Sequence, residues 1–236
     1  MTKTERHSIT SNQYADLLVE YEYGIELLSL YPNSTINYIN DKFAIVHLPV
    51  ENITSSSIGT FGYYAFPACL GLETSEETTA NTTNSKKILF SEDLKLKGNN
   101  VLIGFLDTGI DYQNPVFQNK DGTTRIASIW DQTIDSNNNY PEGFYYGTEY
   151  LKNTINYALE SDDPLSIVPS QDTIGHGTML AGLCAGSPNE AYGFSGIATE
   201  AEFIIVKLKE AKPYLRSFFE IPPSAICYQE NDVIMA

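Results

Sequence analysis

The sequence predicts an α/β fold built on a parallel sheet, and two apolar runs with a small-residue segment between them carry this prediction. The first run, residues 101–106, ends directly at Asp107, and the second covers residues 203–208. Continuous apolar runs of this length are typical of strands buried on both faces of a parallel sheet. Residues 178–185 are small and apolar, which favours a tightly packed helix. Strand, helix and strand in this order predict neighbouring central strands of an α/β domain with flanking helices.

A smaller α+β unit is expected ahead of this core. Residues 15–30 carry spaced apolar side chains that fit either a helix or a strand, and a helix is preferred. Residues 36–50 form two β-rich runs around Asn40-Asp41, which predicts a hairpin.

A polar stretch rich in Glu, Thr, Asn and Ser separates the two parts, because so few apolar residues cannot build a core. The expected organisation is a tail at 1–12, an α+β unit at 13–70, a linker at 71–88 and an α/β part at 89–236.

Two further segments give local predictions. Residues 140–170 are interpreted as an insertion in the α/β core, in which Thr148 caps a helix. The expected apolar face of that helix comprises Leu151, Ile155 and Ala158, with Leu159 beside them. Asn231 or Asp232 resembles an N-cap, yet the sequence stops within about one turn, so the chain is expected to be cut short at its C-terminus.

The charge excludes some partners. The formal net charge is −16, and both nucleic acid and anionic membrane surfaces require clustered Lys and Arg. No apolar run is long enough to span a bilayer, and no secretory signal follows Met1. The expected location is cytoplasmic or spore-associated. Cys69, Cys184 and Cys227 lack the spacing of a disulfide framework or a zinc site, and Cys184 is interpreted as a small buried hydrophobe.

The first candidate site is Asp107-Thr-Gly-Ile-Asp111, directly after the first apolar run. An Asp at the carboxyl end of a central parallel strand lies where α/β folds bind their ligands. Gly109 permits a sharp turn out of the strand. The alternatives are a loop Asp that caps a turn, and the Asp-Thr-Gly of aspartic proteases.

The second candidate site is Gly175-His176-Gly177-Thr178 at the start of the small-residue helix. Two flanking glycines let backbone approach the imidazole closely, and neutral His is the usual base for a hydroxyl nucleophile. By itself, the motif is equally compatible with a core or capping histidine.

Taken together with a third segment, these motifs resemble the subtilisin family. The third segment is Gly193-Phe-Ser-Gly-Ile-Ala198, followed by the apolar run 203–208. Family members carry their catalytic Asp, His and Ser in this order. Four segments are similar to the clostridial germination-type subgroup: residues 129–133, 141–144, 146–150 and 163–169. The unit before residue 71 resembles that subgroup's prodomain.

The resemblance implies roles for the matched residues. Asp107 would orient and stabilise the imidazole, and His176 would be the general base toward a serine, with Thr108, Gly109, Gly175, Gly177 and Thr178 as supporting motif residues. Met179 replaces a second His of the family motif at a position expected to serve packing. Val116 stands where many relatives have a calcium-binding Asp, so neither metal nor cofactor is expected. The implied partners are a protein or peptide substrate and the protein's own prodomain.

The nucleophile departs from the family pattern. The sequence contains no Gly-Thr-Ser motif, and Ser195 lies before a strand instead of at a helix start. The family's oxyanion-hole Asn is also missing. The resemblance therefore implies a serine endopeptidase of which this chain carries only Asp and His. The alternative is an inactive pseudoprotease or truncated remnant with a binding or regulatory role in spore germination.

Overall fold

A computed structural model describes residues 3–22, 24–32, 34–54, 57–72, 96–136 and 139–236. The chain divides into two compact units. The first unit comprises residues 1–72, 144–146 and 209–236, and the second comprises residues 73–143 and 147–208. Most of the predicted linker, residues 73–88, lies outside the described residues.

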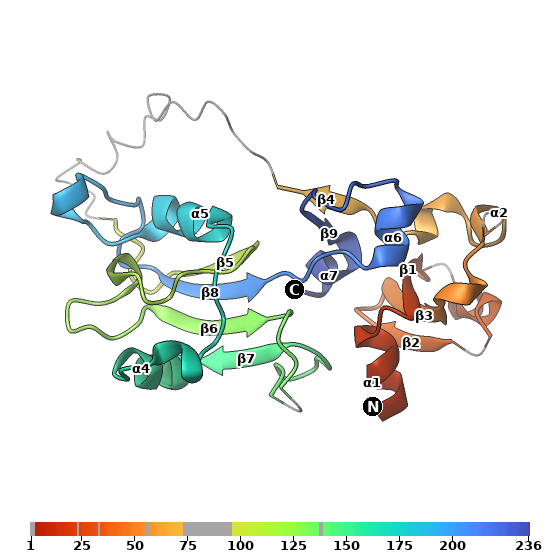
Figure 1. Ribbon diagram of the computed structural model, residues 1–236, viewed down its shortest axis with the longest axis horizontal. Helices are drawn as coiled ribbons and strands as arrows, with labels where there is room; N and C mark the ends of the chain where they lie inside the picture. The colour runs from red at the N-terminus through yellow and green to blue at the C-terminus, as the bar shows by residue number, and fades with distance from the viewer. Residues whose placement is uncertain (1–2, 23, 33, 55–56, 73–95, 137–138) are drawn as a thin grey trace. The chain divides into compact units, whose positions relative to one another are not determined.

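The second unit is the predicted α/β core. Its four-stranded sheet has the order β5-β8-β6-β7, with β8 parallel to both neighbours and β7 antiparallel to β6. The strands are β5 Leu102–Asp107, β6 Ile126–Asp131, β7 Thr148–Leu151 and β8 Glu202–Lys207. The helices are α4 Lys152–Leu159 and α5 His176–Ala185, with short 3-10 turns η4 Pro115–Phe117, η5 Pro164–Ser166 and η6 Glu190–Tyr192. In Figure 1, α5 runs along β5, which it contacts, and α4 lies against β6 and β7.

The two predicted parallel strands are neighbours, but β5 is an edge strand. Among the described strands β5 pairs with β8 alone, and Leu102 and Leu106 are 51% and 40% exposed. Ile103 and Phe105 instead pack against the buried cluster around Phe203. The prediction of a central strand buried on both faces is therefore wrong for β5, because only one of its faces meets the core of this unit.

A buried arginine joins three segments of the second unit: η4, the last residue of α5 and the residue before β8. The Arg125 guanidinium donates hydrogen bonds to the carbonyls of Val116, Ala185 and Ala201, at 2.6–2.8 Å. Burial lowers the pKa of Arg125. One guanidinium therefore holds together the carbonyls of three segments that are distant in the sequence.

The first unit contains a three-stranded antiparallel sheet in the order β1-β3-β2. Its strands are β1 Tyr14–Glu20, β2 Thr35–Tyr38 and β3 Phe43–Pro49, and a second, two-stranded sheet pairs β4 Cys69–Gly71 with β9 Cys227–Gln229. The helices are α1 Lys3–Thr10, α2 Ser57–Phe61, α6 Pro213–Phe218 and α7 Glu230–Met235, with 3-10 turns η1 Ile25–Leu30, η2 Val50–Asn52 and η3 Tyr63–Ala65. The predicted hairpin is confirmed as β2 and β3.

The predicted helix over residues 15–30 is wrong. The segment is strand β1 followed by η1, and five consecutive residues of β1 are buried. Ala15, Leu17 and Val19 belong to the core cluster, while Asp16 and Leu18 are buried on the opposite face. A strand buried on both faces does not alternate between apolar and polar residues, so the periodicity of its sequence does not distinguish it from a helix.

The C-terminal segment packs with the first unit, although it was predicted to belong to the α/β part. Ala211, Leu215 and Cys227 lie in one buried cluster with Ala15 and Leu17. Burial of these apolar side chains stabilises residues 209–236 in the first unit.

Three local predictions are corrected by the structure. Thr148 lies in β7 and donates to the carbonyl of Ile134, while Leu151 stands at the N-cap of α4. Asn231 and Asp232 are buried inside α7, whose N-cap is Gln229. Cys184 is exposed, because α5 turns Gly177, Ala181 and Ala185 toward the core.

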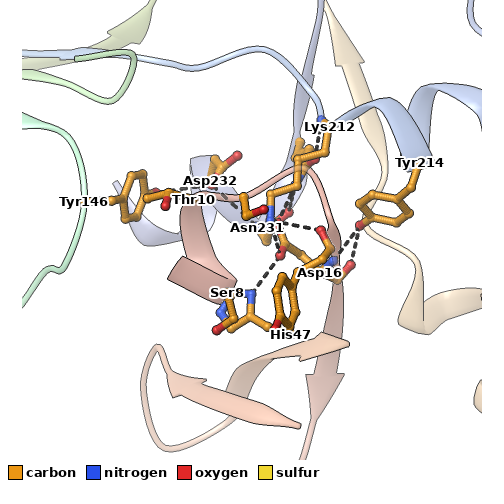
Figure 2. A network of polar contacts seen from close by, with 12 residues as sticks. Ser8, Thr10, Asp16, His47, Tyr146, Lys212, Tyr214, Asn231 and Asp232 are labelled. Carbon is orange, nitrogen blue, oxygen red and sulfur yellow. Dashed lines mark hydrogen bonds and ion pairs between the residues drawn. The ribbon is translucent and has the colours of Figure 1, made fainter. Parts of the chain in front are cut away.

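A buried polar network centres on Asp16 in the first unit, as Figure 2 shows. The Asp16 carboxylate accepts hydrogen bonds from Lys212 Nζ at 2.7 Å and Gln229 Nε2 at 3.1 Å, and it lies 2.7 Å from His47 Nδ1. The Tyr214 hydroxyl donates to the Asp16 carbonyl. Burial alone would raise the pKa of Asp16, but Lys212 and His47 beside it hold that pKa well below its ordinary value.

Among the described residues, no helix has both the length and the apolar character that crossing a membrane requires.

Candidate active site

Asp107 is the last residue of β5, at the carboxyl edge of the parallel strands. Its side chain is largely buried, and its Oδ1 accepts a 2.7 Å hydrogen bond from the backbone N–H of Thr108. The chain then turns through Gly109, which has φ +112°. A Cβ at Gly109 would lie 3.1 Å from the Lys207 side chain, so glycine gives both the backbone conformation and the space.

His176 is the first residue of α5 and points toward Asp107. Its Nδ1 lies 2.8 Å from Asp107 Oδ1 and 2.9 Å from Oδ2, which confirms the predicted contact. An ionised carboxylate only accepts hydrogen bonds, so Nδ1 carries the proton in this pair. The neutral ring then has its lone pair on Nε2, and the side chain is 18% exposed. This is the tautomer that a general base needs.

Gly177 permits the close approach of α5 to the end of β5. A Cβ at this position would lie 2.2 Å from the carbonyl oxygen of Gly109 and 3.1 Å from the Cβ of Asp107. Real Cβ atoms do not come that close to backbone oxygen, so any side chain would push the helix away. The glycine after the histidine is therefore a requirement of the Asp107–His176 geometry.

The two threonines of the motifs link the loops around this pair. Thr108 Oγ1 accepts from the backbone N–H of Gly177 at 2.9 Å. Thr178 Oγ1 accepts from the backbone N–H of Asp111 at 2.9 Å. Each threonine therefore connects one motif with the other.

Asp172 also contacts both motifs, although it belongs to neither of them in the sequence. Its carboxylate accepts hydrogen bonds from Thr108 Oγ1, from Thr178 Oγ1 and from the backbone N–H groups of Gly175 and Thr178. Burial would raise the pKa of Asp172, but these hydrogen bonds outweigh it and lower the pKa. The available signal was an acidic residue just before a helix start.

Met179 and Ser195, which the sequence singled out beside the two motifs, are both exposed. Met179 is 49% exposed on α5, so the expected packing role is wrong. It borders an open hollow of about 470 Å³ together with Val116 and Leu183. Ser195 is exposed, in the predicted loop, and its hydroxyl donates to the carbonyl of Gly196.

No serine hydroxyl in the described part of the chain hydrogen bonds to His176. The described residues also contain no group of three or more His, Cys, Asp or Glu side chains that could hold a metal ion.

The comparison with protein families agrees with the motifs. Residues 98–220, just over half of the chain, match the model of the Subtilase family. No curated protein matches the chain. Among solved structures, the CspB protease of Clostridium perfringens is 39% identical, with a TM-score of 0.43. The match covers 50% of this chain and 22% of that protein, so the chain spans about a fifth of its length. On its family match, the chain belongs to the subtilase family.

Proposed function

We propose that the protein is a serine-type endopeptidase, with Asp107 as the orienting carboxylate and His176 as the general base. The observation that carries this proposal is the Nδ1 contact of His176 with both carboxylate oxygens of Asp107 at 2.8 and 2.9 Å. Asp107 stabilises the imidazolium that forms when Nε2 takes a proton, and the protonated ring then donates it to the leaving amine. Membership of the subtilase family supports this class of activity.

The nucleophile has to come from a Gly-Thr-Ser segment, which this sequence does not contain. A base and its orienting carboxylate do not hydrolyse peptides without a nucleophile within reach, because the three groups act as a unit. The proposal therefore assigns the chemistry to Asp107 and His176 only in the presence of such a segment.

The 236-residue chain by itself is expected to show no peptidase activity. Purified chain should neither cleave casein above the buffer rate nor react with a fluorophosphonate probe, which labels activated serines. His176→Ala serves as the control for any residual signal. Labelling together with cleavage that His176→Ala abolishes would overturn this expectation and identify a serine elsewhere in the chain.

The absence of a Gly-Thr-Ser motif from this sequence favours a second candidate, a binding or regulatory pseudoprotease with a role in spore germination. The gene beyond codon 236 separates the two. A reading frame that continues into a Gly-Thr-Ser motif favours the protease, and its product should lose several orders of magnitude of casein hydrolysis on His176→Ala. A continued frame without the motif, or a product whose hydrolysis survives that substitution, contradicts the proposed protease.

We propose further that residues 13–70 act as this protein's own prodomain, which aids folding and inhibits the protease. The compact α+β organisation of the first unit supports this role. A cytoplasmic or spore-associated location and a protein or peptide substrate complete the proposal.

Deletion of residues 1–87 tests the folding role. Ala211, Leu215 and Cys227 would lose their buried partners on β1 and β3, which exposes apolar surface. The shortened chain is therefore expected to give a lower yield of folded protein and stronger binding of a hydrophobic dye than the intact chain. Equal yield and equal dye binding would count against this role.

A further inference from the structure

We propose that Asp172, acting through Thr108, is a positioning residue that sets the contact between His176 and Asp107. This inference rests on the proposed function, since it concerns the same pair. Within the described part of the chain, Asp172 forms no hydrogen bond with the His176 ring or with the Asp107 carboxylate. It acts instead through Thr108, which follows Asp107, and through the backbone on either side of His176.

On the His176 side, Asp172 fixes the start of α5. Its Oδ1 accepts from the backbone N–H of Gly175 at 2.8 Å, and its Oδ2 accepts from the backbone N–H of Thr178 at 2.9 Å. These residues stand directly before His176 and two positions after it. Gly175, the N-cap residue, has no side chain to supply this contact, so Asp172 satisfies helix-start N–H groups that would otherwise lack a protein partner.

On the Asp107 side, Asp172 reaches the strand end through one hydroxyl. Thr108 Oγ1 donates to Asp172 Oδ1 at 2.8 Å and accepts from the backbone N–H of Gly177 at 2.9 Å. The Thr108 hydroxyl therefore connects three elements: the end of β5, the first turn of α5 and the loop before that helix. His176 lies between two residues that this connection holds, Gly175 and Gly177.

The electrostatics of Asp172 suit this role. Its carboxylate is partly buried, and its hydrogen bonds keep the pKa below the ordinary value, so it is ionised at neutral pH. Hydrogen bonds to an ionised acceptor are about twice as strong as neutral ones. The simpler reading is a helix cap that contributes only to stability, and the experiment has to separate the two.

The test measures the Nδ1 proton of His176 in the intact 236-residue chain by NMR. In the parent chain this proton is expected to give a downfield resonance that exchanges slowly with water and that disappears in Asp107→Ala, which removes the acceptor. Asp172→Asn and Thr108→Val should each accelerate its exchange by about tenfold or more, because the ring separates from the carboxylate more often. Both should also move the resonance upfield, because a weaker hydrogen bond to the Asp107 carboxylate deshields the proton less.

Two features of the design exclude a trivial explanation. Thr108→Val changes no charge, so a shift shared by both variants does not come from removing the Asp172 charge. Asp121→Asn removes the same charge from an exposed carboxylate that accepts only from Thr123 among the described contacts, and it should change nothing. If Asp172→Asn fails to fold, Thr108→Val alone decides the outcome.

The proposal is overturned if the variants unfold at lower temperature while the exchange rate and the position of this resonance stay at the parent values. That result would make Asp172 a helix cap only. A parent resonance that survives Asp107→Ala would instead show that the Asp107–His176 contact is absent, and the proposed function would then fail together with this inference.

Discussion

Replacing Asp16 with asparagine is expected to lower the free energy of unfolding by about 3–5 kcal/mol, measured by urea unfolding at neutral pH. The substitution leaves the Lys212 ammonium without its charged partner, and both side chains are almost completely buried. An uncompensated buried charge costs far more than a lost surface ion pair. His47 and Gln229 would also face an amide in place of a carboxylate.

A double variant separates the ion pair from other effects. Asp16→Asn combined with Lys212→Met removes both charges, and it is expected to be less destabilised than Asp16→Asn alone. Asp41→Asn, in the exposed turn between β2 and β3, is the matched control and should change stability by less than about 0.5 kcal/mol. An Asp16→Asn loss no larger than that of this control would show that the pair is not buried.

The pH dependence of stability gives an independent check on Asp16. Its pKa in the folded protein is lowered, so its contribution to stability is fully present above the unfolded-state pKa of about 3.9. The contribution is lost as the pH falls below that value toward the folded-state pKa. The parent chain should therefore lose stability more steeply below about pH 4 than Asp16→Asn, whereas equal slopes would contradict the assignment.

Gly177→Ala is expected to destabilise the second unit by about 3 kcal/mol and to abolish the Nδ1 contact of His176 with Asp107. The added methyl group would lie 2.2 Å from the carbonyl oxygen of Gly109, and backbone on both sides has to move to accept it. The same shift separates the helix start from the end of β5. Thermal unfolding measures the first effect, and the His176 Nδ1 proton resonance measures the second.

Gly182→Ala is the control for this prediction, because it lies in the same helix. Its Cβ would meet only the Phe194 ring at 3.6 Å, an ordinary contact. Alanine favours helix more than glycine does, so Gly182→Ala should leave stability unchanged or raise it by up to about 1 kcal/mol. Equal effects of the two substitutions would mean that the close approach at Gly177 is not what destabilises the protein.

The parts of the fold that the sequence predicted correctly are those with local signals. The neighbouring strands β5 and β8 and helix α5 follow from two apolar runs and one small-residue segment. The contact between Asp107 and His176 was predictable because each residue stands at the end of such an element, next to glycines that allow close approach. Membership of the subtilase family follows from the same motifs.

The errors come from features that only distant contacts decide. Strand β1 was predicted as a helix because burial on both faces removes the alternation that marks a strand. Strand β5 was predicted to be central because a run of apolar residues does not reveal whether a second strand lies beside it. Asp172 was missed because its role depends on Thr108, 64 residues earlier in the chain.

The sequence by itself thus determined the family, the α/β core and the Asp107–His176 pair, because these depend on residues within one strand end and one helix start. Tertiary structure alone decided that residues 209–236 belong with the first unit. Lys212 and Asp16 are 196 residues apart, and each alone looks like an ordinary surface charge in the sequence. Only folding shows that the two share one buried site, where the cost of burying each charge is offset by the other together with the contacts that His47 and Gln229 make with Asp16.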